Sequence, residues 1–221
     1  MDEPLKLGVL ISGSGSNLQA LIDNIEKGKL KAVILIVISN NPQAFGIARA
    51  KKHGLPVAVL RHEDFKNREE YDAEVMKILK SNKVDLVVLA GFMRLLTPAF
   101  LNSFPQKIIN IHPALLPSFP GTHGQKNAFN YGVKFSGCTV HFVDEGVDTG
   151  PIIIQSVVPV LQDDTEETLS ARILKEEHRI YPQAIQFIAE GKIKFIGRKV
   201  HIKESSTISL TALHNPPLAG F

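Results

Sequence analysis

Short apolar runs alternate with amphipathic stretches along the first half of the chain. Four to eight consecutive apolar residues bounded by turn residues are typical of buried strands, and apolar residues three or four apart are typical of helices. The predicted strands cover residues 5–11, 32–38, 57–60, 85–90 and 108–112. The predicted helices begin near Leu18, cover residues 43–53 and 68–82, and begin again after Thr97-Pro98. Successive strand–helix units indicate an α/β fold on a mainly parallel sheet with helices on both faces.

The second half of the chain changes character. Residues 135–143 alternate polar and apolar side chains, with Thr139 and His141 on one face, and a glycine-bearing loop follows at 144–151. Residues 152–158 are again strand-like. Two strands joined by a short loop predict a mixed or antiparallel C-terminal extension of the sheet.

The C-terminal part predicts one long helix and a small hairpin. The helix is expected from Thr165 to about Glu190, and Pro182 inside it is expected to kink or split it, because proline lacks the N–H that a helix interior needs. Residues 195–202 predict the hairpin, and residues 204–221 predict a loosely held tail.

The composition bounds the class of protein. With 221 residues, 44% of them hydrophobic, the chain can bury a sizeable core. The net charge of +3 comes without a basic block, which argues against nucleic-acid binding and favours small anionic ligands. No signal sequence is visible and no apolar run approaches the roughly 20 residues that span a bilayer. The single cysteine, Cys138, fits a reducing, cytoplasmic setting and is expected to be a buried structural thiol.

Two polar residues interrupt the apolar strand at 108–112. Asn110 and His112 lie two positions apart, so a strand presents both on one face, at the carboxyl end where open α/β sheets hold ligands. Prolines at positions 113, 117 and 120 would order the following loop, as a preorganised site requires. The alternative is that each side chain is a core polar group with its own partner. An amide beside an imidazole favours a reaction site.

A glycine-rich turn follows the first strand. Residues 12–17 read Ser-Gly-Ser-Gly-Ser-Asn and lead into a helix, so backbone N–H groups at the helix start are available to an anion. The dinucleotide fingerprint fails because Leu18 is too large for its third glycine position, and because the second strand ends in Ser39-Asn40-Asn41 rather than an acidic residue. A phosphate cradle is therefore favoured over a nicotinamide site, and a simple tight turn is the open alternative.

The loop after the next strand carries the carboxylates Asp144, Glu145 and Asp148. A carboxylate with Asn110 and His112 forms a set suited to acyl transfer, because the amide and a protonated imidazole can stabilise the oxyanion of a tetrahedral intermediate. The carboxylate is expected to raise the pKa of the imidazole and to relay a proton to or from water.

Two other chemistries are less favoured. Neither Ser14 nor Ser16 lies in a nucleophile elbow, so direct attack by a second substrate is expected rather than a covalent enzyme intermediate. A metal is not expected, because the spacings of the available side chains match no short ligand motif. Those side chains are His112, His123, His141 and Asp148.

Six motifs, in one order and spacing, resemble a known family. They are ISGSGSNLQA at 11–20, VVLAGFMRLL at 87–96, NIHPALLP at 110–117, FPGTH at 119–123, VDTGPI at 147–152 and KEEHRIYP at 175–182. Over residues 7–197 the chain resembles the folate-dependent formyltransferases, in particular the phosphoribosylglycinamide formyltransferase (glycinamide ribonucleotide transformylase) family of purine biosynthesis. The NxHPxLLP block alone is shared with other enzymes that use 10-formyltetrahydrofolate, whereas the phosphate turn and the EHxIYP segment narrow the choice.

The resemblance implies a single Rossmann-like domain over residues 1–221. Its nucleotide- and phosphate-binding half would be about 1–105, its catalytic and folate-binding half about 106–203, and its tail 204–221. It implies transfer of a formyl group from 10-formyltetrahydrofolate, a co-substrate, to the amine of 5′-phosphoribosylglycinamide. The partners would be small molecules rather than nucleic acid or membrane, no metal is expected, and the chain would be a cytoplasmic monomer or homodimer.

The resemblance also assigns roles to residues. His112 would be the acid or electrostatic stabiliser, Asn110 the oxyanion donor, and Asp148 the charge partner and proton relay. The ribonucleotide would be held by Gly15, Ser16, Asn17 and Glu177. The folate would be held by Arg68, Met93, Arg94, Leu95, Leu96, Asn110, Asp144, Glu145, Gly146, Val147 and Asp148. His123 would lie in a loop over the site.

Three positions depart from the common pattern of the family. Ser14 replaces a common Asn, Ala114 a common Ser, and Leu174 a Gln that often helps to hold the nucleotide, so only the contact at Leu174 is put in doubt. Three alternatives to synthetic transfer stay open: a hydrolase that removes the same formyl group with water, a formyltransferase that acts on charged tRNA, and a non-catalytic nucleotide-binding module. The tRNA enzyme would need an extra basic C-terminal domain.

Overall fold

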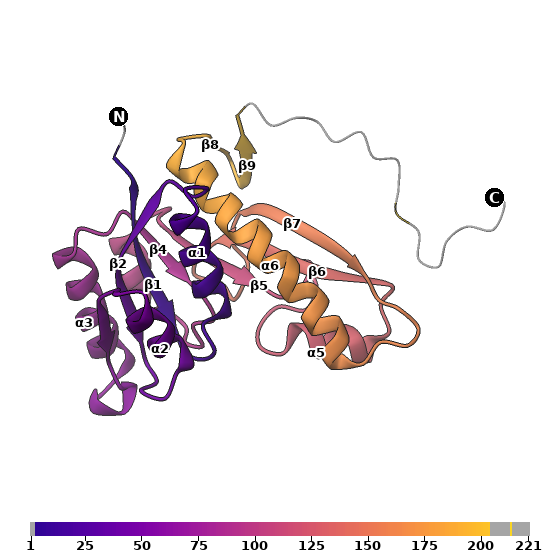
Figure 1. Ribbon diagram of the computed structural model, residues 1–221, viewed down its shortest axis with the longest axis horizontal. Helices are drawn as coiled ribbons and strands as arrows, with labels where there is room; N and C mark the ends of the chain where they lie inside the picture. Colours follow the sequence, from indigo (N-terminus) through magenta and orange to yellow (C-terminus); the bar gives the residue numbers. More distant parts are fainter. Residues whose placement is uncertain (1–2, 204–212, 214–221) are drawn as a thin grey trace.

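A seven-stranded sheet forms the centre of the protein (Figure 1). The computed structural model describes residues 3–203 and residue 213. The strands lie in the order β3-β2-β1-β4-β5-β6-β7. They are β1 (Leu5–Ile11), β2 (Ala32–Ser39), β3 (Val57–Val59), β4 (Leu86–Leu89), β5 (Ile108–His112), β6 (Phe135–Phe142) and β7 (Ile152–Pro159). A second, two-stranded sheet pairs β8 (Ile193–Ile196) with β9 (Lys199–Ile202).

Helices connect these strands, and the sequence pattern predicts each α-helix except α5. They are α1 (Ser16–Glu26), α2 (Phe45–Lys52), α3 (Arg68–Ser81), α4 (Pro98–Ser103), α5 (Gly124–Tyr131) and α6 (Glu166–Ala189), with a 3₁₀ turn η1 at His62–Asp64. Side-chain N-caps fix the starts of α3 and α4. The Asn67 side chain accepts from the N–H of Glu70 at 2.8 Å, and the Thr97 hydroxyl accepts from the N–H of Phe100 at 3.3 Å.

Strands β1 to β5 are mutually parallel, and β6 and β7 pair antiparallel. This arrangement confirms the predicted parallel sheet with an antiparallel extension. The carboxyl ends of β1, β4 and β5 therefore lie at one edge of the sheet, where ligands of open α/β sheets bind.

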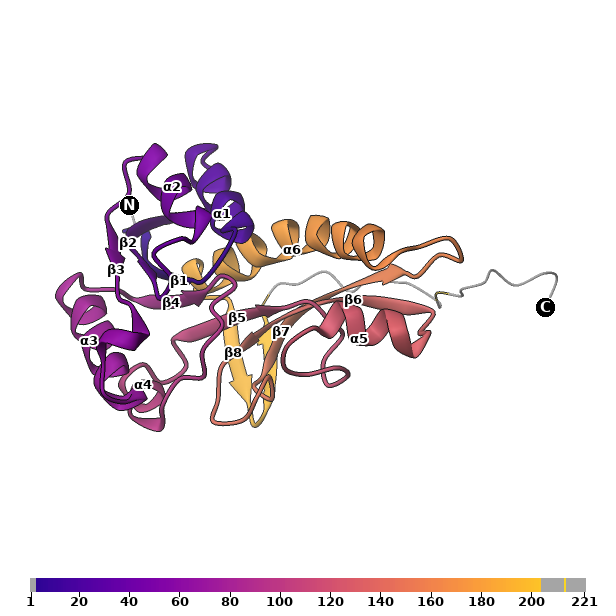
Figure 2. The same cartoon turned by 90° about the horizontal axis from the view of Figure 1, so that it is seen from below.

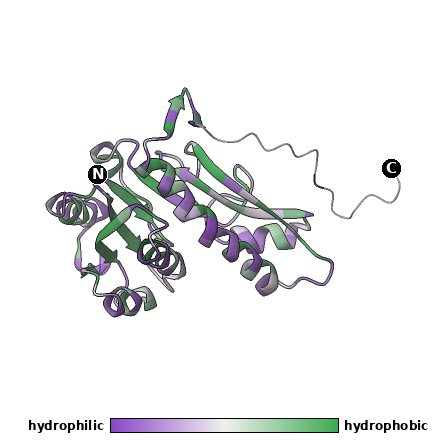
Figure 3. Ribbon diagram, turned by 45° about the horizontal axis from the view of Figure 1, so that its top comes forward, coloured by the Kyte–Doolittle hydropathy of each residue, from purple (hydrophilic) through white to green (hydrophobic). Residues whose placement is uncertain are grey.

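Helices cover both faces of the sheet. On β1, Val9 belongs to the core cluster that includes Leu21 of α1 and Ile185 of α6, whereas Leu10 belongs to the cluster that includes Val75 of α3. Figure 2 shows the same division, with α1, α2 and α6 on one side and α3 and α4 on the other. Figure 3 shows hydrophobic strands between helices whose outer faces are hydrophilic. The central strands, such as β1 and β4, are thus buried on both faces, as their near-continuous apolar sequences require, whereas the edge strand β7 alternates between buried and more exposed positions.

The predicted strand bounds lie within two residues of the observed ones, and the strands at 5–11 and 108–112 agree at both ends. Strand β6 differs in character: its burial is continuous after Phe135, so the alternation at 135–143 does not mark an exposed face. The predicted tail, residues 204–221, lies outside the described residues apart from Leu213.

Helices α5 and α6 correct the sequence reading. Helix α6 runs without a break past Pro182, so of the predicted kink or split, the split is wrong. Tyr181, Ala184 and Ile185 are fully buried around the proline, and their packing supports the helix there. Helix α5 was not predicted, because its sequence, GQKNAFNY, begins with glycine and contains two asparagines, which have low helix propensity.

Candidate active site

Strand β5 presents Asn110 and His112 to one carboxylate. Nδ2 of Asn110 donates to Oδ1 of Asp148 at 3.5 Å, and Nδ1 of His112 lies 3.3 Å from Oδ2. The strand pairs with β4 on one edge and β6 on the other, and His112 is only 3% exposed. The structure therefore brings the predicted amide, imidazole and carboxylate together.

Asp148 reaches β5 from the loop between β6 and β7. Its φ of 54° is in the left-handed region, which is uncommon for a residue other than glycine. The N–H of Gly121 donates to Oδ2 of Asp148 at 2.8 Å, so the prolyl loop after β5 also contacts the acid. Asp144 instead accepts hydrogen bonds within its own loop, and Glu145 is exposed. Of the three candidate acids, Asp148 is the one in the cluster.

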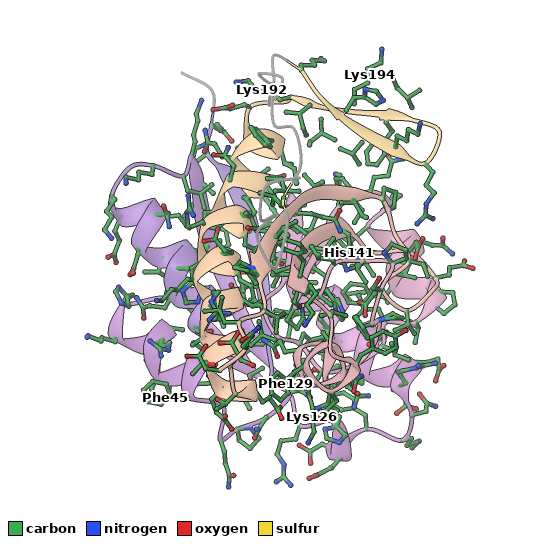
Figure 4. All side chains as sticks on the ribbon, turned by 90° about the vertical axis from the view of Figure 1, so that its right-hand side faces the viewer. Phe45, Lys126, Phe129, His141, Lys192 and Lys194 are labelled. Atoms are coloured by element: carbon green, nitrogen blue, oxygen red, sulfur yellow. The ribbon has the colours of Figure 1, made fainter. Side chains whose placement is uncertain are left out.

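A second imidazole, His141, completes the cluster. It lies opposite Asn110 in the register of β5 and β6, and its Nε2 is 3.4 Å from Nδ2 of Asn110 and 3.6 Å from Oδ1 of Asp148. Figure 4 shows His141 among the side chains packed around β6. Sequence reasoning treated this residue only as a possible metal ligand. The position of His141 on the polar face of residues 135–143 could have identified it as a site residue, but only if the pairing of β6 with β5 had been known.

Burial controls the charge of His112. Burial lowers the pKa of His112, and the Asp148 carboxylate and the Phe119 carbonyl offset only part of that effect. The expected raised pKa is therefore wrong, although the carboxylate acts in the expected direction. Burial alone would raise the pKa of Asp148, but the nearby imidazole of His141, the hydrogen bond from the N–H of Gly121 and the nearby imidazole of His112 hold that pKa below its usual value. A neutral imidazole thus lies beside an ionised carboxylate near neutral pH.

Hydrogen bonding determines which nitrogen of His112 can gain a proton. Nε2 lies 2.8 Å from the carbonyl of Phe119, and a carbonyl only accepts, so Nε2 carries the hydrogen of the neutral ring. Nδ1 then holds the lone pair, facing Asp148. An added proton would go to Nδ1, between the ring and the carboxylate.

The turn after β1 forms the second part of the candidate site. Gly15, with φ of 68°, precedes the first residue of α1, Ser16, so the free N–H groups of the helix start there. Nδ2 of Asn17 donates to Oε2 of Glu177 at 2.7 Å, and Oδ1 of Asn17 is buried without a partner among the described residues. Burial raises the pKa of Glu177 despite this hydrogen bond. The four predicted ribonucleotide residues are therefore contiguous.

A hollow of about 290 Å³ lies beside this turn. It is lined by Ser16, Gln19, Ala20, Asp23, Asn24, Lys27, Arg49 and His178. Burial lowers the pKa of His178, and the charge of Arg49 acts in the same direction, so at neutral pH the positive charge of the hollow comes from Arg49 and Lys27.

The segment after β4 carries four of the predicted folate residues. The Ser12 hydroxyl accepts from the N–H of Met93 at 2.8 Å, which ties this segment to the glycine-rich turn at residues 12–17, the candidate anion turn. Met93 and Leu95 are 71% and 56% exposed, and Leu96 is half-buried. The guanidinium of Arg94 lies 4.7 Å from the ring centroid of Tyr71, a cation–π distance. The segment therefore offers an exposed apolar surface beside a stacked cation.

The remaining predicted residues lie at the surface. Arg68 is exposed at the first position of α3. In the loop before Asp148, Gly146 and Val147 are exposed, as Glu145 is. His123 is exposed just before α5, with φ of 64°. Among the described residues, no hydrogen bond or ion pair joins Arg68, Glu145 or His123 to the cluster on β5.

The described part of the chain lacks two features. Residues 3–203 and 213 hold no group of three or more His, Cys, Asp and Glu placed to bind a metal ion. Within the same residues, no helix combines the length and apolar character needed to cross a membrane.

Known proteins resemble this chain over most of its length. The phosphoribosylglycinamide formyltransferase of Escherichia coli (strain K12) is 43% identical over 190 residues, which cover 86% of this chain and 90% of the relative. The trifunctional purine biosynthetic protein adenosine-3 of Drosophila melanogaster is 51% identical over 188 residues, but the chain spans only 14% of that protein. Glycinamide ribonucleotide transformylase 1 from Symbiobacterium toebii is 48% identical, with a TM-score of 0.89 over 91% of this chain and 95% of that one, which confirms the Rossmann-like fold. The sequence profile described as formyl transferase matches residues 5–185, and the chain belongs to that family.

Proposed function

We propose that the chain transfers the formyl group of 10-formyltetrahydrofolate to the amine of 5′-phosphoribosylglycinamide. The products are formylglycinamide ribonucleotide and tetrahydrofolate. The observation that carries this proposal is the meeting of Asn110 and His112 at the Asp148 carboxylate, 3.5 and 3.3 Å away, in a chain of the formyl transferase family. The anion turn at the same edge of the sheet supports a phosphorylated acceptor.

The two substrates bind to different surfaces of this edge. The phosphate of the ribonucleotide meets the free N–H groups of Gly15, Ser16 and Asn17, and Glu177 contacts its ribose or glycinamide end. The folate lies against the exposed apolar segment after β4 and the loop before Asp148. Its charged end meets arginine, for which the candidates are Arg68 and Arg94. His123 belongs to the loop over the site.

The reaction is direct attack by the amine on the formyl carbon. The carbonyl oxygen becomes an oxyanion, which Nδ2 of Asn110 stabilises by hydrogen bonding, joined by the N–H of His112 when that group turns from the Phe119 carbonyl. The two bonds that Nδ2 makes here are long, at 3.4 and 3.5 Å, so little is lost when the amide turns to the oxyanion. Collapse of the intermediate breaks the bond to N10 of the folate.

The proton moves from the attacking nitrogen to the leaving nitrogen. Asp148 is ionised and accepts the proton of the attacking amine through water, and N10 gains a proton as the bond to carbon breaks. Nδ1 of His112 faces Asp148 and can accept a proton, which the ring and the carboxylate then share when negative charge develops nearby. No covalent enzyme intermediate is required.

One experiment separates this function from its rivals. The protein is mixed with 10-formyltetrahydrofolate, with and without 5′-phosphoribosylglycinamide, and both folate deformylation and the formylated nucleotide are followed. We expect deformylation only with the nucleotide, at one product per formyl lost. Deformylation without nucleotide would identify a hydrolase. Nucleotide binding without any product would identify a binding module.

Cellular location and assembly are further predictions for this chain. The single cysteine supports a cytoplasmic location. The chain is expected to be a monomer or a homodimer, and sedimentation of the purified chain tests which.

A further inference from the structure

Helix α2 packs behind the anion turn and holds its backbone at three points. The N–H of Gly46 donates to the carbonyl of Gly13 at 3.1 Å. Nε of Arg49 donates to the carbonyl of Ser14 at 3.0 Å. At the third point, the backbones of Gly15 and Gly46 are in direct contact. Three successive residues of the turn are thus fixed by one helix.

The glycine contact leaves no room for a side chain on either residue. A Cβ on Gly15 would lie 2.5 Å from Cα of Gly46. A Cβ on Gly46 would lie 2.6 Å from Cδ1 of Ile11 and 3.1 Å from Cα of Gly15. The distance between the turn and α2 is therefore set by the absence of side chains, and any Cβ would push the two backbones apart.

The two carbonyl bonds fix the direction of two N–H groups. A trans peptide is planar, and its C=O and N–H point in opposite directions. With the carbonyls of Gly13 and Ser14 held toward α2, the N–H groups of Ser14 and Gly15 point away from it. Neither N–H donates a hydrogen bond within residues 3–203 and 213. Successive N–H groups with one direction are the arrangement that binds anions.

Arg49 is itself held in place. Its guanidinium lies 4.9 Å from the ring centroid of Phe45, one helical turn earlier, and Nη1 donates to Oε1 of Gln19 at 3.4 Å. Phe45 is 60% exposed, and Figure 4 shows it at the outer side of the molecule, well apart from His141. An exposed aromatic ring stacked on this arginine limits its rotamers, so Nε stays directed at the carbonyl of Ser14.

We propose that Gly46 and Arg49 are positioning residues for the phosphate of the ribonucleotide. They act through the backbone of the turn: Gly46 sets how closely the turn approaches α2, and Arg49 aims the peptide between Ser14 and Gly15. This inference rests on the proposed function, because it takes the turn to be the phosphate site. It gives a role in nucleotide binding to α2, which lies outside the six family motifs of the sequence.

Substitutions of Arg49 separate positioning from charge. In Arg49→Gln, the side-chain nitrogen follows the same number of bonds as Nε, so the N–H to Ser14 is kept and the charge is lost. Arg49→Met loses both. We expect Arg49→Met to raise the KM for 5′-phosphoribosylglycinamide about tenfold, because one charge-assisted hydrogen bond, from Arg49 to the Ser14 carbonyl, is lost. The kcat and the KM for folate should stay within about twofold of wild type. Arg49→Gln should stay close to wild type.

The opposite pattern would overturn the proposal. If Arg49→Gln is as impaired as Arg49→Met while Arg49→Lys is not, Arg49 acts by its charge on the phosphate. If all three Arg49 variants have the same nucleotide KM as the wild type, Arg49 has no role in nucleotide binding. Lys52→Met is the matched control, because Lys52 is an exposed cation in the last turn of the same helix, and it should change nothing.

A second pair of variants tests Gly46. Gly46→Ala should raise the nucleotide KM and lower the melting temperature, since its Cβ meets both Ile11 and Gly15. Adding Ile11→Val removes Cδ1, so stability should recover while the nucleotide KM stays raised. Recovery of both together would mean that Gly46 serves only packing. Failure of the wild-type chain to form formylated nucleotide would instead sink the proposed function itself, before any variant is compared.

Discussion

The anion turn after β1 and the reaction cluster on β5 lie at the same edge of the sheet but use different atoms. The turn offers backbone N–H groups, and it depends on Gly15, which has φ of 68° and no space for a Cβ. The cluster offers side chains: Asn110 and His112 from one strand and Asp148 from a loop. In the proposed function, one region therefore recognises the phosphate charge with the main chain, and the other performs the chemistry with side chains.

This difference predicts two kinds of variant. Changes in the cluster remove groups that act in the transition state, so they should reduce kcat. Changes in the turn alter the geometry of groups that bind the ground state and the transition state alike, so they should raise the KM for the nucleotide. Both regions must be changed for the contrast to be tested.

The largest effect is expected for His112→Ala. The change removes the donor beside the oxyanion and the group that shares a proton with Asp148, so kcat should fall by up to about 10⁴-fold, the upper range for one acid–base group. Nucleotide affinity, measured by calorimetry, should stay near wild type, because the turn is untouched. A variant with full turnover would remove His112 from the mechanism.

Asn110→Ala should reduce kcat by about 10²- to 10³-fold, the usual effect of removing one oxyanion donor. The amide makes only long contacts in this structure, so the protein should keep its melting temperature. Steady-state kinetics with both substrates measure the effect. An increase in folate KM with unchanged kcat would assign Asn110 to binding alone.

Asp148→Asn should lower turnover by about 10²-fold, because the proton acceptor is lost. It should also lower the pKa of His112 further. In the wild type burial holds that pKa below its usual 6.5, and the carboxylate opposes the shift, so its removal leaves burial less opposed. NMR titration of the imidazole should therefore show a midpoint at lower pH in the variant. An unchanged midpoint would argue against the His112–Asp148 pair.

Gly15→Ala tests the other region. The left-handed backbone and the 2.5 Å approach to Gly46 both oppose a Cβ, so the turn should distort. Nucleotide KM should rise by about 10- to 100-fold, corresponding to the roughly 1–2 kcal/mol that a left-handed residue costs and the added clash. Gly13→Ala is the matched control, since its Cβ would meet nothing within 4 Å. Equal effects of the two changes would contradict the contact with α2.

The two regions also differ in how far the sequence predicts them. The turn is contiguous, so Ser-Gly-Ser-Gly-Ser-Asn predicts both its place and its chemistry without knowledge of the fold. The pair Asn110 and His112 is also local, since strand geometry alone puts them on one face. Asp148 is 36 residues from His112 in the chain (148 − 112), and spacing alone did not distinguish it from Asp144 and Glu145.

Other features were beyond the sequence pattern because they depend on pairing and burial. His141 joins the cluster through the register of β6 against β5, which no single strand specifies. The direction of the pKa shift of His112 depends on how deeply the ring is buried, so the carboxylate alone gave the wrong sign. Pro182 stays within α6 because tertiary packing outweighs helix propensity.

The β8–β9 hairpin suggests one more test of the cluster. Its Phe195 ring lies 4.9 Å from the ring of Phe142, at the end of β6, and the guanidinium of Arg198 donates to the carbonyl of Thr149. The hairpin thus contacts the loop that carries Asp148 near its start and near its end. It supports the loop from outside the site.

The smallest effect is expected for Arg198→Ala. Thr149 directly follows Asp148, so loss of the hydrogen bond to its carbonyl should let the acid sample other positions. One such bond contributes roughly 0.5–1.5 kcal/mol, which corresponds to a fall in kcat of about two- to twelvefold. The KM for the nucleotide should not change, because the lost hydrogen bond lies next to Asp148 and not in the turn. Lys194→Ala is the control: Lys194 is exposed on β8, and Figure 4 shows it at the outer side of the hairpin. If Arg198→Ala raised the nucleotide KM instead, the turn and the cluster would be coupled, and the separation of binding from chemistry between the two regions would be wrong.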